Sequence, residues 1–90
     1  MDLKEKVRVA LKAAIADARL RLEDDDGISG IIVSSEFKGM SSLDRQTLID
    51  RALRHSTVKF SNQERRKILA IAALTPTEFE FVDPAFLGSH

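Results

Sequence analysis

The chain has 90 residues, too few to divide its apolar side chains between two independent cores, so we expect one domain. Its apolar fraction of 43% and charged fraction of 31% are those of a globular protein and exclude a disordered one. Fourteen basic side chains balance fourteen acidic ones, so the whole chain offers no long-range attraction for a nucleic-acid backbone. It has no cysteine, which excludes disulfides, thiolate nucleophiles and cysteine-ligated clusters on this chain.

The first predicted element is an amphipathic helix over residues 2–16. Its apolar residues recur at spacings of three and four, which places them on one helical face. That face consists of Leu3, Val7, Ala10, Leu11 and Ala14. Charged residues interrupt the segment, so it contains no apolar stretch of the length of a signal peptide or a membrane span. We therefore expect a cytoplasmic protein without a membrane partner.

A β-hairpin is predicted next. Residues 18–23 alternate arginine and leucine with the two-residue period of a half-exposed strand. The acidic run Asp24–Asp26 followed by Gly27 suits a tight reversal, and residues 28–35 are rich in β-branched side chains. The acidic run could also bind a hard cation, although it lacks the length and terminal glutamate of an EF-hand loop, so a solvated turn is favoured.

Two further helices are predicted by their capping residues. Ser41 with Asp44 begins a helix over residues 42–54, and Ser61 with Glu64 begins another at Asn62. The apolar face of the longer helix consists of Leu43, Leu48, Ile49, Ala52 and Leu53, and it leaves Asp44, Arg45, Gln46, Asp50 and Arg51 for solvent or a partner.

The stretch over residues 64–74 suits either a helix or a buried strand, and its periodicity does not decide between them. Thr75, Pro76 and Glu78 then begin a short last helix or turn. We expect Asp83 and Pro84 to end it, so that residues 1–84 form the domain and residues 85–90 a tail. This order of elements predicts an α+β domain with helices packed on one face of a small sheet.

The run from Ile31 to Leu53, together with the later ALTPTEF, resembles the BolA family. The matching positions are Val33, Ser34, Phe37, Gly39, Ser41, Arg45, Leu48, Ile49, Leu74, Thr75 and Pro76. The resemblance implies that residues 69–74 are a third strand, which gives the order αββααβα and a likeness to type II KH domains. It also implies a non-enzymatic regulatory domain, associated with stress response and iron–sulfur proteins, whose partner is another protein such as a monothiol glutaredoxin.

The sequence departs from the family where the family's ligands stand. Gln46 and Thr47 replace the family's His-Arg, and Lys67 stands where relatives have a histidine that ligates a cluster. The short turn at Gly27 replaces a longer loop that carries a Cys or His. A protonated lysine has no free lone pair for iron, so we expect no cofactor, and cluster ligation is doubtful. The only histidines, His55 and His90, match neither position.

Two classes of function remain. The favoured one is protein binding through a sheet edge and the helix surface beside it, in a monomer or weak dimer. Its candidate residues are Lys67, Phe37, Lys38, Gly39 and Arg45. The alternative is a transcriptional regulator with weak nucleic-acid binding through Arg45, Arg51, Arg54, Lys59, Arg65, Arg66 and Lys67. The connection between the two helices that carry them lacks the glycines with which a KH domain clamps nucleic acid.

Overall fold

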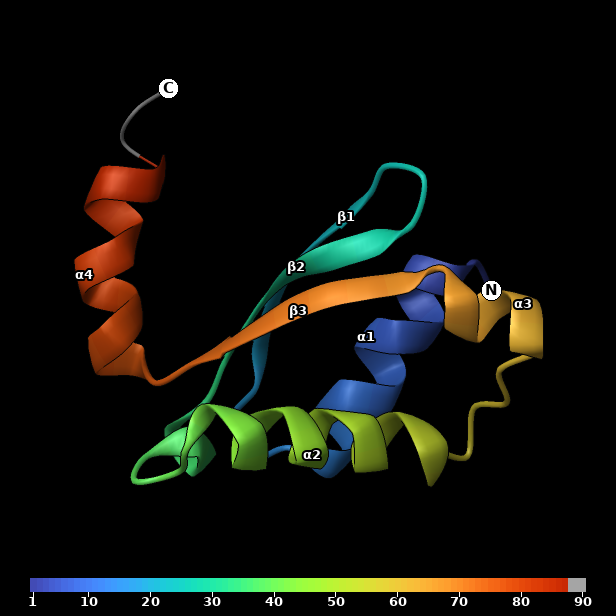
Figure 1. Cartoon of the computed structure of the whole chain (residues 1–90), viewed down its shortest axis with the longest axis horizontal. Coiled ribbons are helices and arrows are strands. Elements are labelled where there is room, and N and C mark those ends of the chain that lie inside the picture. The colour runs from blue at the N-terminus through green and yellow to red at the C-terminus, as the bar shows by residue number, and fades with distance from the viewer. Residues whose placement is uncertain (88–90) are drawn as a thin grey trace.

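The computed structural model describes the backbone of residues 1–87 and the side chains of residues 1–81. The elements follow the predicted order αββααβα (Figure 1). They are α1 (Leu3–Ala14), β1 (Arg19–Asp24), β2 (Ile28–Val33), a 3-10 turn η1 (Ser35–Phe37), α2 (Ser42–Arg54), α3 (Asn62–Arg66), β3 (Ile68–Leu74) and α4 (Pro76–Leu87). The α+β class is confirmed, and the stretch that periodicity left open divides into a short helix and a strand.

The three strands form one mixed sheet in the order β1-β2-β3. The acidic turn joins β1 to β2 as an antiparallel hairpin, with Asp26 and Gly27 both at positive φ. The strands β2 and β3 are parallel, so the chain must cross from one end of the sheet to the other between them. The segments η1, α2 and α3 make this crossing, which brings α2 alongside β3 (Figure 1).

The core lies between one face of the sheet and the helices α1 and α2. Its buried residues come from all five of these elements and from η1: Val7, Leu11, Ile15, Leu22, Ile28, Ile32, Phe37, Ile49, Ala52, Ile71 and Ala73. The predicted faces of α1 and α2 hold with two exceptions. Leu43 is exposed, because nine residues separate it from Ala52 and place it on the opposite side of the helix. Ala14 is also exposed, in the last turn of α1 beside a shallow hollow between α1 and α2.

The last helix differs from the prediction in two respects. It continues to Leu87, past the proline that was expected to end it, since the φ of proline is compatible with a helix even though its ring crowds the preceding turn and its nitrogen has no hydrogen to donate. Its Phe79 shares a pocket with Ile31 and Val33, which point away from the core by the alternation of β2. The helices α1 and α2 therefore pack on one face as predicted, whereas α4 meets the other.

A polar cluster joins the start of the hairpin to η1. The carboxylate of Asp17, at a φ of 44°, accepts hydrogen bonds from the hydroxyls of Ser34 and Ser35. These bonds lower the pKa of Asp17. The Ser34 hydroxyl also donates to the carbonyl of Ala16 at 2.6 Å, and the Glu36 carboxylate accepts from the Ala16 amide at 2.7 Å. Ser34 is buried, so its hydroxyl bonds within the chain and contributes to the fold.

Candidate interaction site

Arg45 links three elements at the C-terminal end of β3. Its guanidinium donates to the carbonyl of Ala73 at 3.1 Å and to the carbonyl of Met40 at 3.1 Å. It also forms a two-pronged ion pair with Glu78, at 2.7 and 3.2 Å. The side chain of Arg45 is only 14% exposed. An arginine whose donors are engaged in this way joins α2, β3 and α4, and has little capacity left for a partner.

Glu78 completes the same junction from the side of α4. Its carboxylate accepts from the Thr75 amide at 2.8 Å, and the Thr75 hydroxyl accepts from the Glu78 amide at 3.1 Å. This reciprocal pair is the capping box that the sequence predicted. Hydrogen bonds from Arg45 and then from Thr75 lower the pKa of Glu78 to about 2. The charged form of Glu78 is therefore the one that the fold stabilises.

The other predicted partner residues near this end differ in exposure. Phe37 is fully buried in the core, which removes it from any docking surface and corrects the expectation that it contacts a partner. Lys38 and Gly39 are exposed. Gly39 has a φ of +78°, a conformation that glycine adopts without strain, and no atom lies within 4 Å of where its Cβ would be. Its role in the structure is thus a turn into α2.

Lys67 lies at the opposite end of β3, where it follows α3 and precedes Ile68. The seven residues of β3 separate it from the junction at Arg45, a length of roughly 20 Å at about 3.3 Å per residue. The structure therefore does not bring the five predicted partner residues into one surface. Lys67 is exposed, and only its backbone is engaged, through a carbonyl that accepts from the Ile28 amide.

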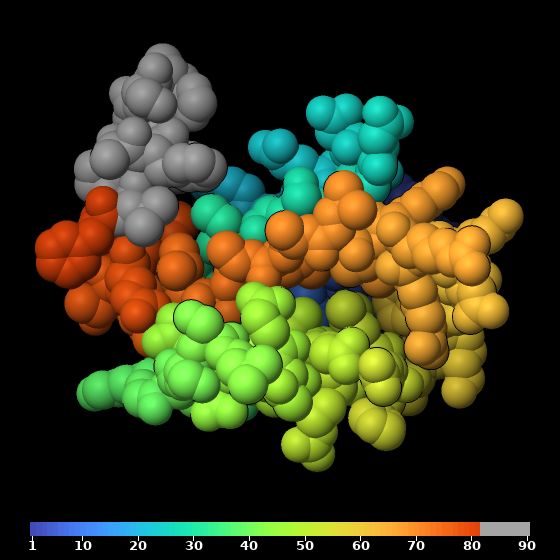
Figure 2. Space-filling model, viewed as in Figure 1, coloured from blue at the N-terminus to red at the C-terminus, as the bar shows by residue number. Residues whose placement is uncertain are grey.

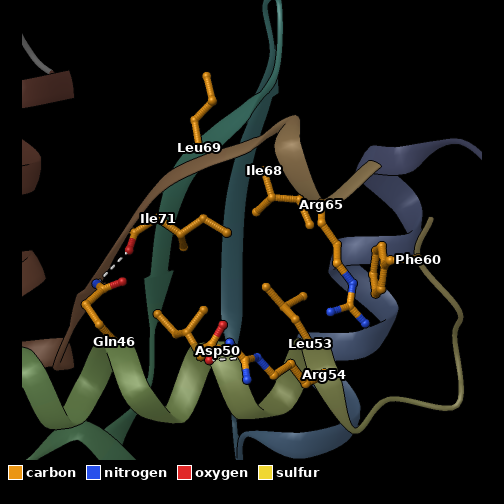
Figure 3. A pocket seen from close by; sticks show the side chains of 10 residues that line it. Gln46, Asp50, Leu53, Arg54, Phe60, Arg65, Ile68, Leu69 and Ile71 are labelled. Carbon is orange, nitrogen blue, oxygen red and sulfur yellow. Dashed lines mark hydrogen bonds and ion pairs between the residues drawn. The ribbon is translucent and has the colours of Figure 1, made fainter. Parts of the chain in front are cut away.

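A groove of about 320 Å³ lies between α2, α3 and the outer edge of β3. Figure 2 shows α2 and β3 side by side on this face of the molecule, with α3 next to them. The lining residues combine an apolar set with a polar set: Ile49, Leu53, Phe60, Ile68, Leu69 and Ile71, then Gln46, Asp50, Arg54 and Arg65. Ile68 and Ile71 point from β3 toward Leu53 on α2 (Figure 3). Apolar walls with few polar groups are typical of a binding groove.

The polar side chains of the groove differ in whether they already have a partner within the chain. Arg54 pairs with Asp50 at 3.0 Å. Gln46 is exposed, as predicted, and it also donates to the carbonyl of Ile71 at 3.0 Å, an acceptor on the outer edge of β3. The guanidinium of Arg65 lies beside the ring of Phe60 (Figure 3), and within the described part of the chain it has no ion-pair partner. Arg65 is thus the free charge of the groove.

The short helix α3 is anchored so that its basic residues face outward. Ser61 and Glu64 form the predicted capping box. The ammonium of Lys6 on α1 contacts Glu64 at 2.7 Å and the carbonyl of Lys59 at 3.4 Å. This contact with Lys6 is the main reason that the pKa of Glu64 is lowered. With Glu64 turned toward α1, the next three residues, Arg65, Arg66 and Lys67, are all exposed.

The predicted nucleic-acid set is distributed over several surfaces. Arg54 and Arg65 line the groove, and Arg66 and Lys67 continue from it along the chain. Arg51 lies on the other flank of α2, where it lines the hollow beside α1. Arg45 is held in its junction, and Lys59 is exposed in the connection before α3. A smaller basic patch at the N-terminal end of β3 replaces the continuous one that the sequence suggested.

The residues present do not fit an iron–sulfur cluster. Lys67 offers an ammonium, and the sequence contains no cysteine. His55 is an exposed residue at the C-terminal cap of α2, and His90 lies outside the described residues. Among residues 1–81, no group of three or more His, Asp or Glu side chains is arranged to hold a metal ion, and this includes the acidic turn. In the described part of the chain, no helix has the length and apolar character needed to cross a bilayer.

The fold and sequence resemble solved structures along almost the whole chain. A Bol-like protein from Babesia bovis is 29% identical, with a TM-score of 0.66 over 92% of this chain and 95% of that one. BolA1 from Arabidopsis thaliana is 23% identical, with a TM-score of 0.65 over 87% and 96%. A BolA protein homologue from Coxiella burnetii is also 23% identical, with a TM-score of 0.56 over 88% and 92%. No family model matches the sequence, and no curated protein matches it.

Proposed function

Because this chain belongs to the BolA-like family, we propose that it is a non-enzymatic adaptor or regulatory domain that acts by binding another protein. The observation that carries the proposal is the groove between α2, α3 and β3. It combines an apolar floor with Arg65, a guanidinium that has no ion-pair partner in the described residues. An apolar contact bordered by a complementary charge is the arrangement through which protein interfaces obtain affinity and orientation.

The partner best suited to this surface presents an apolar side chain next to a carboxylate. The apolar part would pack against Leu53 and Phe60, and the carboxylate would pair with Arg65. Arg66 and Lys67 extend the positive charge beyond the groove, which favours the approach of an acidic surface. In the family that this chain resembles, a monothiol glutaredoxin is the first partner to test.

The chain would bind such a partner without ligating its cluster. Lys67 supplies an ammonium where a relative supplies an imidazole, and an ammonium has no lone pair for iron. In place of a bond to iron, Lys67 would contribute positive charge beside a cluster that carries negative thiolates. The protein would therefore recognise the holo form of the partner without changing the coordination of its metal.

The test compares Arg65→Glu with Arg51→Glu in binding to a cluster-loaded monothiol glutaredoxin. Both arginines are exposed and both substitutions change the net charge equally, but Arg51 lies outside the groove. We expect Arg65→Glu to weaken binding by tenfold or more, about 1.4 kcal/mol, and Arg51→Glu to leave it nearly unchanged. Equal effects of the two substitutions would contradict the groove as the docking site. The visible spectrum of the cluster should stay that of the free partner, and a changed spectrum would contradict binding without ligation.

The patch formed by Arg54, Arg65, Arg66 and Lys67 also favours a second candidate, a regulator that binds nucleic acid. The pairing of Arg54 with Asp50 reduces the charge available to phosphates. If phosphate contacts carry the binding, the affinity for a DNA or RNA duplex should fall steeply as salt is raised. Absence of binding at low salt would eliminate this candidate and leave protein binding.

A further inference from the structure

The two outer edges of the sheet differ in whether other parts of the chain form hydrogen bonds to them. At the outer edge of β3, the carbonyls of Ile71 and Ala73 accept hydrogen bonds from Gln46 and Arg45 of α2. At the outer edge of β1, no further strand pairs with the sheet in the described residues. An unpaired edge is a template on which another strand can add. β1 lies across β2 from β3, so this edge is separate from the proposed docking groove.

The direction of the free backbone groups on β1 follows from the pairing of β2. Ser34, which directly follows β2, donates its amide to the carbonyl of Leu74 at 3.0 Å, so its backbone faces β3. Because backbone groups alternate along a strand, those of Gly30 and Ile32 also face β3. Gly30 lies opposite Leu22, and Ile32 lies opposite Leu20. The amides and carbonyls of Leu20 and Leu22 therefore point outward, away from the sheet.

The sequence of this edge is complementary to itself in the antiparallel direction. Residues 19–25 read RLRLEDD, with two arginines before the middle leucine and acidic residues after it. When two copies align with Leu22 opposite Leu22, Arg21 of one lies opposite Glu23 of the other, and Arg19 lies opposite Asp25. Shifting this register by two residues places Arg21 against Arg21 or Glu23 against Glu23. The pattern of charges thus selects one alignment.

We propose that β1 pairs with β1 of a second copy of this chain, in the antiparallel register centred on Leu22. The outward backbone groups of Leu22 then make a hydrogen-bonded pair, as do those of Leu20 with those of Asp24 in the other copy. The charged positions alternate with these and fall in non-hydrogen-bonded pairs, where the Cα atoms approach to about 4.5 Å and side chains meet closely. Both sheets join into one continuous sheet about a two-fold axis, which closes the open edge.

The charged residues of β1 are available for this pairing. Arg19, Arg21 and Glu23 are exposed, as is Asp25 in the turn. None of the four makes an ion pair within the described part of the chain. Charged edge strands usually prevent association, because like charges meet when two identical edges pair. In β1 the positive residues precede the negative ones, so in one register opposite charges meet and the two edges attract each other.

Amide hydrogen exchange as a function of protein concentration tests the pairing directly. The Leu22 amide is free in the monomer and bonded in the dimer, whereas the Arg21 amide faces β2 in both. We expect exchange at Leu22 to slow as the concentration rises, while exchange at Arg21 stays constant. Unchanged exchange at Leu22 up to about 1 mM protein, together with a monomeric mass by sedimentation, would overturn the proposal.

Charge exchange tests the register. Arg21→Glu and Glu23→Arg should each shift the dimer to monomer by tenfold or more in the dissociation constant, because each places like charges opposite one another. The double variant with both substitutions restores the opposite signs and should dimerise again. Arg51→Glu, on α2, is the control for net charge and should dimerise like the natural sequence. A double variant as monomeric as the single ones would exclude this register. Binding to the glutaredoxin is measured separately, so loss of one interaction is distinguishable from loss of the other.

Discussion

One arginine lies beside each end of β3, Arg45 on α2 and Arg65 on α3, and although the sequence gives them similar surroundings, their contacts in the structure differ. At the C-terminal end, Arg45 donates to Met40, Ala73 and Glu78, and its side chain is 14% exposed. At the N-terminal end, Arg65 lines a groove without an ion-pair partner in the described residues. The difference indicates that the first end holds the fold together and that the second is free to bind.

The reason for this difference is the position of each arginine relative to buried acceptors. Arg45 lies in the first turn of α2, from which its side chain reaches the carbonyls of Met40 and Ala73 and the carboxylate of Glu78 in the first turn of α4. Both carbonyls would lose this donor without Arg45, and Ala73 is buried, where an acceptor without a partner is costly. Arg65 follows Glu64, which turns toward Lys6, so Arg65 is left on the outside of α3.

The largest effect that separates the two ends is expected from Arg45→Ala. The substitution removes a charged donor from two backbone carbonyls and leaves the carboxylate of Glu78 without its ion-pair partner. We expect it to destabilise the fold by about 2 kcal/mol or more. Chemical denaturation monitored by circular dichroism measures the loss. Arg45→Lys is the informative companion, because lysine keeps the charge but cannot make the two-pronged contact, and it should recover only part of the stability. Full recovery with lysine would show that charge alone matters at this junction.

A smaller effect, confined to acid, is expected at Glu78. Its pKa is about 2 in the folded protein and 4.5 when unperturbed, so the folded state binds its proton less readily than the unfolded state does. The stability that this pair contributes is fully present above pH 4.5 and is lost as the pH falls from there toward 2. Thermal melts of Glu78→Gln and the natural sequence across this window should converge as the pH falls. Curves that remain parallel would mean that Glu78 is not held in its charged form.

Much of the fold follows from local signals in the sequence. The capping residues Ser41, Ser61 and Thr75 stand one residue before α2, α3 and α4, as predicted. Helix capping involves residues only three positions apart, so it can be read from a short stretch of sequence. The residues of β3 alone do not determine that the segment is a strand. Its run of apolar side chains suits a helix equally, and the parallel pairing with β2 that makes it a strand is a long-range property. The resemblance to a family supplied that information.

The candidate site was less predictable, because its composition depends on which side chains the fold already engages. Phe37 and Arg45 stood out in the family pattern, and the structure shows that they serve the core and a junction. Gln46 gave no signal of its contact with the carbonyl of Ile71, which lies 25 residues away in the chain. The groove itself arises where α2 passes β3, so no local motif describes it. The choice of Lys67 rests on its distance from Thr75 and Pro76 in the sequence, which needs no knowledge of contacts, and its role in binding stays a prediction.

The smallest expected effect on stability lies at the N-terminal end of β3. It gives the clearest test of the difference between the two ends of this strand. Lys67→Ala removes an exposed side chain whose residue is engaged only through its backbone, so the free energy of unfolding should change by no more than about 0.5 kcal/mol. Its affinity for the cluster-loaded glutaredoxin should nevertheless fall several-fold, since a rim charge acts mainly on association and on its dependence on salt. Measuring both quantities on the same variant separates binding from folding. If Lys67→Ala lost stability as Arg45→Ala does, both ends of β3 would be structural and the division between them would not hold.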